Sequence, residues 1–233
     1  MLPTSRDGKR AEAPHHPADV NPYARWVYDH PGLLIADPHP AQVREQLAPL
    51  GPGGACAVDL GCGSGNFLLQ LATQAPQTRF VGFELRYKRL VKAARKLERA
   101  GLDNVVLLRE SAERCFAYFP PASLDAVYLN FPDPWPKVAQ RKKRLVAPAF
   151  LARLAAVLRE GGRFHFKTDH SGYFLHVLSL LDRAAGLRIA AFSNDLSRSP
   201  LPGDGARSEF EQLFRAQRKS IHCLVLEKSP TRG

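Results

Sequence analysis

Two carboxylates and a glycine-rich turn form the first place in this 233-residue chain that could do chemistry. The segment VDLGCGSGNF places Asp59 before Gly61 and Gly63, and Glu84 follows FVGF about 20 residues later. Glycines between a strand and a helix let a ligand approach the backbone and the N–H groups of the helix start. An acid after the next strand can accept both hydroxyls of a ribose. The competing interpretations are a plain tight turn and a solvated acid.

A second place is the stiff segment NFPDPWP, residues 130–136. Proline fixes φ near −65° and restricts the residue before it, so Asp133, between Pro132 and Pro134, has little backbone freedom. A fixed carboxylate suits preorganised contact with the edge of a nucleobase. Trp135 could stack on a base, or it could pack into the core instead.

A cluster of five cations follows this turn, and the chain as a whole is basic. Its members are Lys137, Arg141, Lys142, Lys143 and Arg144. The chain carries 33 Lys and Arg against 22 Asp and Glu, a net charge of +11. Such a cluster beside a candidate active-site turn favours contact with phosphates, although a solvated basic face is the common alternative. We therefore expect a nucleic acid partner.

Strand and helix patterns alternate from residue 55 onward. Strands are expected at residues 55–60, 79–85, 104–110, 124–131, 163–169, 187–195 and 220–228, and helices at 40–50, 66–75, 87–101, 148–162 and 172–186. This order predicts an α/β fold with a mostly parallel, doubly wound sheet. Only an irregular, charged stretch is expected between the last two strands. The terminal strand is therefore predicted to be antiparallel, at the end of the sheet.

The rest of the chain bounds its organisation and location. Residues 1–22 lack periodicity and are predicted to form a disordered basic tail, with residues 23–233 forming a single domain. No apolar run reaches the roughly 20 residues that span a bilayer. The four cysteines form no Cys-x-x-Cys pair, which favours a reducing, cytoplasmic compartment and argues against a metal site. The oligomeric state, monomer or homodimer, stays open.

The glycine turn and the acid after the second strand together carry a resemblance. DLGCGSGNF with FVGFE resembles the class I methyltransferases, whose Rossmann-like fold binds S-adenosyl-L-methionine. The resemblance implies that Gly61 and its neighbours line the methionine part and that Glu84 holds the ribose. It also implies that Glu110, Ser111 and Ala112 border the adenine.

Three later segments are more specific. NFPDPWPK with RKKRL, HFKTDHSGYF and SEFEQLFRAQRKSIHCL are similar to the bacterial tRNA (guanine-N7)-methyltransferases, the TrmB family. The resemblance implies methylation of N7 of guanosine 46 in the tRNA variable loop. It makes Asp133 the catalytic residue, bordering the cofactor, and Asp59 a cofactor-site residue. The implied substrate contacts are Lys137, Asp169, Ser208, Glu209, Phe210 and Glu211.

Three positions depart from the family pattern. Asp59 is shorter than the usual glutamate, and Ser208 replaces a threonine but keeps its hydroxyl. Ser111 stands where Asp or Asn is common, so the adenine contact is expected to fall to Glu110 or to a backbone group. None of these changes removes the reaction.

The chemistry of the target atom defines what Asp133 should do. N7 of guanine has an in-plane lone pair and no proton, so its methylation needs no general base and leaves a positive charge on the purine. We therefore expect Asp133 to orient the base and offset that charge. Two alternatives stay open. One is methylation of an exocyclic amino or amide nitrogen; the other is a non-catalytic RNA-binding protein on a methyltransferase-like scaffold.

Overall fold

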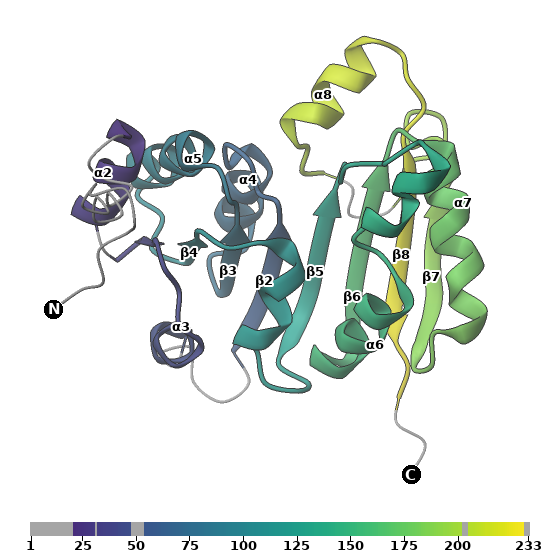
Figure 1. Cartoon of the computed structure of the whole chain (residues 1–233), viewed down its shortest axis with the longest axis horizontal. Helices are drawn as coiled ribbons and strands as arrows, with labels where there is room; N and C mark the ends of the chain where they lie inside the picture. Colours follow the sequence, from purple (N-terminus) through teal and green to yellow (C-terminus); the bar gives the residue numbers. More distant parts are fainter. Residues whose placement is uncertain (1–20, 31, 48–53, 202–204, 231–233) are drawn as a thin grey trace, which may run out of the picture.

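The computed structural model describes residues 21–30, 32–47, 54–201 and 205–230, which form one eight-stranded sheet in the order β1-β4-β3-β2-β5-β6-β8-β7 (Figure 1). The strands are β1 (Leu34–Ile35), β2 (Ala55–Leu60), β3 (Thr78–Phe83), β4 (Val105–Leu108), β5 (Leu124–Asn130), β6 (Leu158–Thr168), β7 (Leu187–Ser193) and β8 (His222–Lys228). Pairs from β1 through β6 are parallel, while β8 is antiparallel to both β6 and β7. The predicted mostly parallel sheet with an antiparallel last strand is confirmed.

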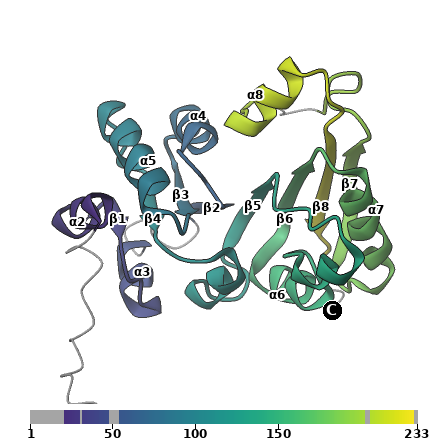
Figure 2. The same ribbon diagram turned by 45° about the horizontal axis from the view of Figure 1, so that its top comes forward.

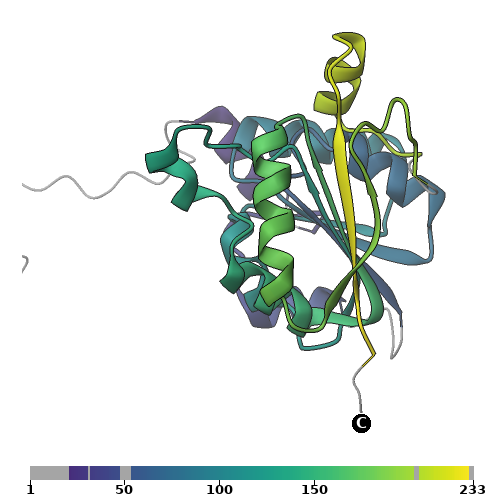
Figure 3. The same cartoon turned by 90° about the vertical axis from the view of Figure 1, so that its right-hand side faces the viewer.

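Helices cover both faces of this sheet. They are α2 (Pro22–Asp29), α3 (Pro40–Leu47), α4 (Asn66–Gln74), α5 (Tyr87–Arg99), α6 (Pro148–Val157), α7 (Ser171–Leu180) and α8 (Glu209–Ala216), with 3-10 turns η2 (Ala112–Tyr118), η3 (Val138–Lys143) and η4 (Leu181–Arg183). One apolar core joins α2, α4 and α5 to the sheet, and the other joins α3, η2, α6 and α7. Figure 3 looks from the β7 edge and shows α7 against the sheet, with α8 above the strand ends.

Four features differ from the expectations. β8 lies inside the sheet and β7 forms its edge. The 148–162 helix ends at Val157, and residues from Leu158 already belong to β6, where Leu158 pairs with Leu124. The stretch between the last two strands contains α8 rather than only irregular chain. The short β1 and helix α2 were not expected.

The predicted tail falls on residues 1–20, which lie outside the described part, and on Asn21 and Pro22. Asn21 caps α2, since its side chain accepts hydrogen bonds from the backbone of Tyr23 and Ala24. Pro22 is the first residue of that helix, a position that proline favours. None of the helices in the described part is long and apolar enough to cross a membrane. The same residues contain no cluster of three His, Cys, Asp or Glu side chains that could hold a metal ion.

Candidate active site

A cavity of about 870 Å³ opens at the carboxyl ends of the parallel strands, where the strand order changes direction between β2 and β5. This is where doubly wound folds bind ligands, and the volume is that of a small-molecule site. The predicted site residues that line it are Asp59, Gly61, Gly63, Glu84, Glu110, Ala112, Asp133, Ser208, Glu209 and Phe210. Four others, Ser111, Lys137, Asp169 and Glu211, are not among its lining residues.

The glycine turn needs glycine for both conformation and packing. Gly61, Gly63 and Gly65 have φ of 75°, 59° and 79°, in the left-handed region that side chains disfavour. A Cβ on Gly65 would lie 2.8 Å from the Cβ of Ala93, so the turn packs directly on α5. A Cβ on Gly61 would meet nothing within 4 Å, which leaves this part of the backbone open to the cavity.

Asp59 is a buried carboxylate at the end of β2, with 2% of its surface exposed. Burial raises its pKa from 3.8 to about 7; the neighbouring Asn130 amide opposes that rise and the Glu84 charge adds to it. The buried Nδ2 of Asn130 nevertheless has no partner that meets hydrogen-bond geometry. The cavity floor therefore holds an acid poised to ionise near neutral pH and an unused amide donor.

Glu84 and Glu110 follow β3 and β4, and their carboxylates have different numbers of hydrogen-bond partners. Glu84 is 9% exposed, and its Oε1 accepts a hydrogen bond of 2.8 Å from the backbone N–H of Arg86. Glu110 uses both oxygens, because Oε1 accepts from the Ser111 backbone and Oε2 from the Tyr118 hydroxyl, each at 2.7 Å. Its Oε2 also lies 3.2 Å from Arg114.

The turn that carries Asp133 is strained at both ends. Phe131 and Trp135 have φ of 52° and 42°, a conformation that bulky side chains rarely adopt and that tends to occur at functional sites. Asp133 is exposed and lines the cavity between them. The side chain of Trp135 is half-buried, and the Lys143 ammonium lies 4.8 Å from its ring centre.

Arg144 holds this turn, in contrast to its interpretation as a phosphate contact. It is 5% exposed, and its Nε donates to the Pro134 carbonyl at 2.8 Å. Its Nη1 donates to the Gly172 carbonyl at 3.2 Å, and its guanidinium lies 4.8 Å from the Tyr173 ring centre. Burial and the Arg141 charge lower its pKa, although it stays a cation. Because the partners lie on α7 and the turn, no local sequence signal marked this residue.

Three other cations of the cluster, Arg141, Lys142 and Lys143, lie on the 3-10 turn η3. Lys142 and Lys143 line the cavity, whereas Lys137 precedes η3 and is exposed away from its lining. The arrangement brings positive charge to the rim of the cavity beside Asp133.

Helix α8 is fixed to the sheet by buried charges. The Ser208 hydroxyl caps it by accepting from the Glu211 backbone at 3.1 Å. The Glu211 side chain is fully buried, with Lys167 of β6 at 2.9 Å and Arg215 at 2.8 Å. Nearby, Asp169 lies 3.7 Å from Lys219. Ser208 and Glu211 thus build the helix, and the Glu211 carboxylate is enclosed by protein.

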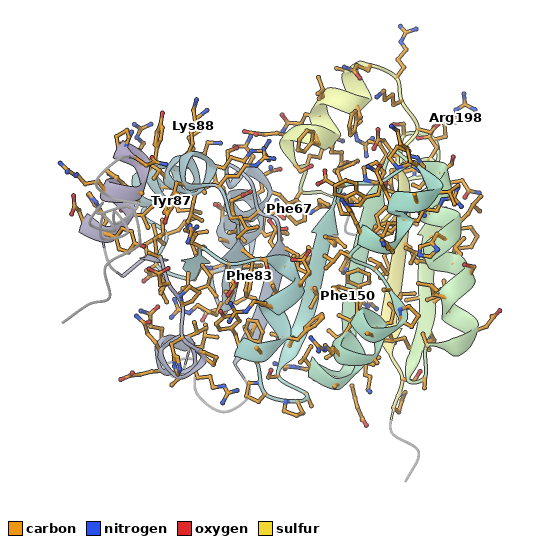
Figure 4. All side chains as sticks on the ribbon, in the orientation of Figure 1. Phe67, Phe83, Tyr87, Lys88, Phe150 and Arg198 are labelled. Carbon is orange, nitrogen blue, oxygen red and sulfur yellow. The ribbon has the colours of Figure 1, made fainter. Side chains whose placement is uncertain are left out.

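The start of α8 also reaches across to the opposite half of the sheet (Figure 2). The Glu209 carboxylate accepts from the Ser64 hydroxyl and, at 2.9 Å, from the Asn66 amide. Lys96 lies 3.4 Å from the same carboxylate. This network, which sequence reasoning missed, places α8 over the glycine turn. Figure 4 shows Phe67, another cavity-lining residue, in the region between α4 and the end of β5.

Residues 54–224 match the family described as "Putative methyltransferase". Among curated proteins, the chain is 34% identical over 212 residues to the tRNA (guanine-N(7)-)-methyltransferase of Geobacillus kaustophilus, covering 89% of this chain and 96% of that protein. It is 31% identical over 214 residues to the bifunctional glycosyltransferase/methyltransferase of Fusobacterium nucleatum, covering 91% of this chain but only 33% of that protein.

Solved structures show the same fold. An antibiotic-related methyltransferase superposes with a TM-score of 0.61 at 21% identity, covering 84% of this chain and 98% of its own. A 16S rRNA methyltransferase gives 0.59 at 20% identity, covering 80% and 93%. The expected Rossmann-like class I methyltransferase fold is confirmed. By its family match and its curated relatives, the chain belongs to the tRNA (guanine-N7)-methyltransferase family.

Proposed function

We propose that this protein is an S-adenosyl-L-methionine-dependent tRNA (guanine(46)-N7)-methyltransferase that forms 7-methylguanosine in the variable loop. The observation that carries the proposal is the placement of Asp133. Its strained, proline-bounded turn faces the same cavity as the glycine turn and Glu84. The names of the curated relatives support the base and the atom, and the family pattern supports position 46.

The cavity residues fit the cofactor of this family. The methyl donor, S-adenosyl-L-methionine, supplies a methyl group on a positively charged sulfur when it is bound. The open backbone at Gly61, beside Gly63, would admit the methionine part, and Glu84 would accept from the ribose hydroxyls. Asp59 would favour a bound cation once it is ionised, and the unused Asn130 donor would meet an acceptor. On the adenine side, Ala112 lines the cavity while Ser111 does not.

Asp133 would orient the guanine and offset the charge that develops on it. Its carboxylate can accept from N1–H and the 2-amino group, and its turn is held by Arg144 through the Pro134 carbonyl. A rigid acceptor needs little reorganisation during the reaction, which is where electrostatic catalysis gains most. No proton leaves N7, so Asp133 has no base role in this account.

The remaining predicted substrate contacts divide by position. Ser208, Glu209 and Phe210 line the cavity and could meet the nucleotide as it enters. Lys137 and Asp169 lie outside the lining and would act on the flanking chain of the RNA. Glu211, enclosed by Lys167 and Arg215, would act through the position of α8.

Mapping the methylated nucleotide tests the proposal. Purified protein, labelled cofactor and unmodified tRNA should give label at a single variable-loop guanosine. That nucleotide should become sensitive to borohydride and aniline cleavage, as N7-methylated guanosine is. Label on an exocyclic nitrogen or on another RNA would support the first alternative. Binding of tRNA without transfer would support the second.

A further inference from the structure

The strongest charge concentration outside the active-site turn lies on α5, the helix that follows Glu84. Between Arg86 and Arg99 the sequence has seven basic residues and one acid, a net charge of +6 out of the chain's +11. The proposed reaction leaves most of these cations without a role. Only Arg86 and Arg89, at the start of the helix, line the cavity.

Four of the cations form a single exposed row, which we call the α5 stripe: Lys88, Lys92, Arg95 and Arg99. Their spacing of four, three and four residues places them on one face of the helix, over a length of about 17 Å. Within the described part of the chain, none of the four forms an ion pair with a carboxylate. In Figure 4, Lys88 projects from the outer side of α5, away from the sheet.

Two aromatic residues of α2 flank the stripe. The ring of Tyr23 is 36% exposed, with the Lys88 ammonium 6.0 Å from its centre. The Arg95 guanidinium lies 5.3 Å from the ring centre of Trp26. A row of cations without carboxylate partners is suited to a nucleic acid, because phosphates can meet the charges. The exposed ring of Tyr23 could also stack on an unpaired base, whereas Trp26 is half-buried and stacks on His30, with ring centres 4.1 Å apart.

The stripe also continues from the cavity. Arg86 and Arg89 lie on its rim at the start of α5, while Lys142 and Lys143 of η3 contribute to the lining beside the Asp133 turn. An RNA strand seated in the cavity would therefore meet η3 on one side and α5 on the other. α5 then leads away along the sheet face that carries α2 and α4.

We propose that the α5 stripe binds the phosphate backbone of a segment of the same tRNA that lies outside the methylated loop. This inference rests on the proposed function, since it takes tRNA as the substrate. Two positive surfaces flanking the cavity fix the orientation of a folded RNA as well as its affinity. The stripe supplies affinity for the whole tRNA, and the cavity selects the guanosine.

The test compares two double variants that each remove two exposed cations. Lys92→Gln with Arg99→Gln changes the stripe, and Arg44→Gln with Arg153→Gln changes α3 and α6 on the opposite sheet face. Glutamine keeps helix propensity close to that of the residues it replaces. Arg95 is left in place because it contacts Trp26. Thermal melting shows whether both variants are folded.

Binding is measured by fluorescence anisotropy between 50 and 300 mM salt, on unmodified full-length tRNA and on a short hairpin with only the variable-loop segment. For tRNA, the stripe variant should lose about 1.4 to 1.8 from the slope of log K against log salt and bind about ten- to twentyfold more weakly at 0.15 M. The control should change less than about twofold. On the hairpin, both variants should bind like the wild type.

If both variants lost the same affinity for tRNA, the proposal that the α5 stripe binds tRNA would be refuted, because the effect would then come from net charge alone. If the stripe variant lost as much affinity for the hairpin as for full-length tRNA, the proposed contact between the stripe and a segment outside the methylated loop would be refuted. The methylation assay separates this inference from the proposed function: kcat at saturating tRNA should be unchanged in the stripe variant, with KM raised. A wild type that binds tRNA through the stripe yet forms no 7-methylguanosine would refute the proposed function alone.

Discussion

Glu211→Gln tests how α8 is held over the active site. In the structure the Glu211 carboxylate is fully buried between Lys167, whose side chain is 7% exposed, and Arg215 at 19%. The substitution keeps the size of the side chain but removes the negative charge that faces the nearly buried Lys167 and the partly buried Arg215. Breaking a buried ion pair in this way costs about 3–5 kcal/mol. That is a large share of the roughly 5–15 kcal/mol that stabilises a domain.

The expected loss is measured by urea unfolding, where it should lower the midpoint by about 1–2 M. Because α8 also carries Glu209 and Phe210 into the cavity, tRNA methylation should fall as well. The matched variant replaces both partners, Lys167→Met with Glu211→Leu. The double variant should recover most of the lost stability, because apolar groups replace Glu211 and the nearly buried Lys167, while Arg215, whose side chain is 19% exposed, can turn to water.

The opposite pattern would refute this reasoning. If Glu211 served only to contact tRNA, Glu211→Gln would raise KM for tRNA and leave the urea midpoint within experimental error. The double variant would then be no more stable than the single one. Should Glu211→Gln fail to fold, the double variant alone still decides, because a contact residue with no structural role predicts no recovery.

Two further predictions follow from the site. Arg144→Lys removes the Nε–H that donates to the Pro134 carbonyl, so it should lower kcat about 10- to 100-fold and leave cofactor affinity unchanged. Rapid-quench kinetics measure the first quantity and calorimetry the second. A change only in the salt dependence of tRNA binding would instead make Arg144 a phosphate contact. The second prediction concerns Asp59, whose pKa burial raises from 3.8 to about 7. Between these two pKa values the folded state binds a proton that the unfolded state does not. The contribution of Asp59 to the free energy of unfolding therefore falls as pH rises from about 4 to 7, by up to about 1.4 kcal/mol per pH unit. Asp59→Asn cannot titrate and should lack that slope, so the wild-type-minus-variant difference in unfolding free energy, measured by urea unfolding, should fall as pH rises from about 4 to 7. A difference that does not change with pH would contradict the assignment.

The parallel core of the fold was predictable because its strands and helices are long and regular. Apolar residues of α5 recur at helical spacing, with Leu90, Val91, Ala94 and Leu97 all buried, and each strand of the parallel core is a short apolar run. Helix α8 was missed because SEFEQLF reads as charged and short. Its capping pattern, Ser208 followed three residues later by Glu211, was nevertheless a usable signal.

The cavity composition was also readable from the sequence, whereas the roles of individual charges were not. Strand ends place Asp59, Glu84 and Asp133 at one edge of the sheet, so their convergence follows from topology. Arg144 looked identical to its neighbours in RKKR, and only the approach of α7 makes it a buried anchor. Glu211 likewise depends on Lys167, which is 44 residues earlier in the chain. Such long-range pairings are set by tertiary packing, which local patterns do not encode.

The central claim, that Asp133 orients guanine for attack by N7 and does not remove a proton, is tested most directly by single-turnover methyl transfer. Rates are measured for the wild type and Asp133→Asn at saturating cofactor and tRNA, from pH 6 to 9. The account predicts a wild-type rate that is nearly independent of pH and a variant slowed at least about 100-fold with its cofactor affinity retained. A variant with near-wild-type rate, or a wild-type rate rising tenfold per pH unit, would contradict it.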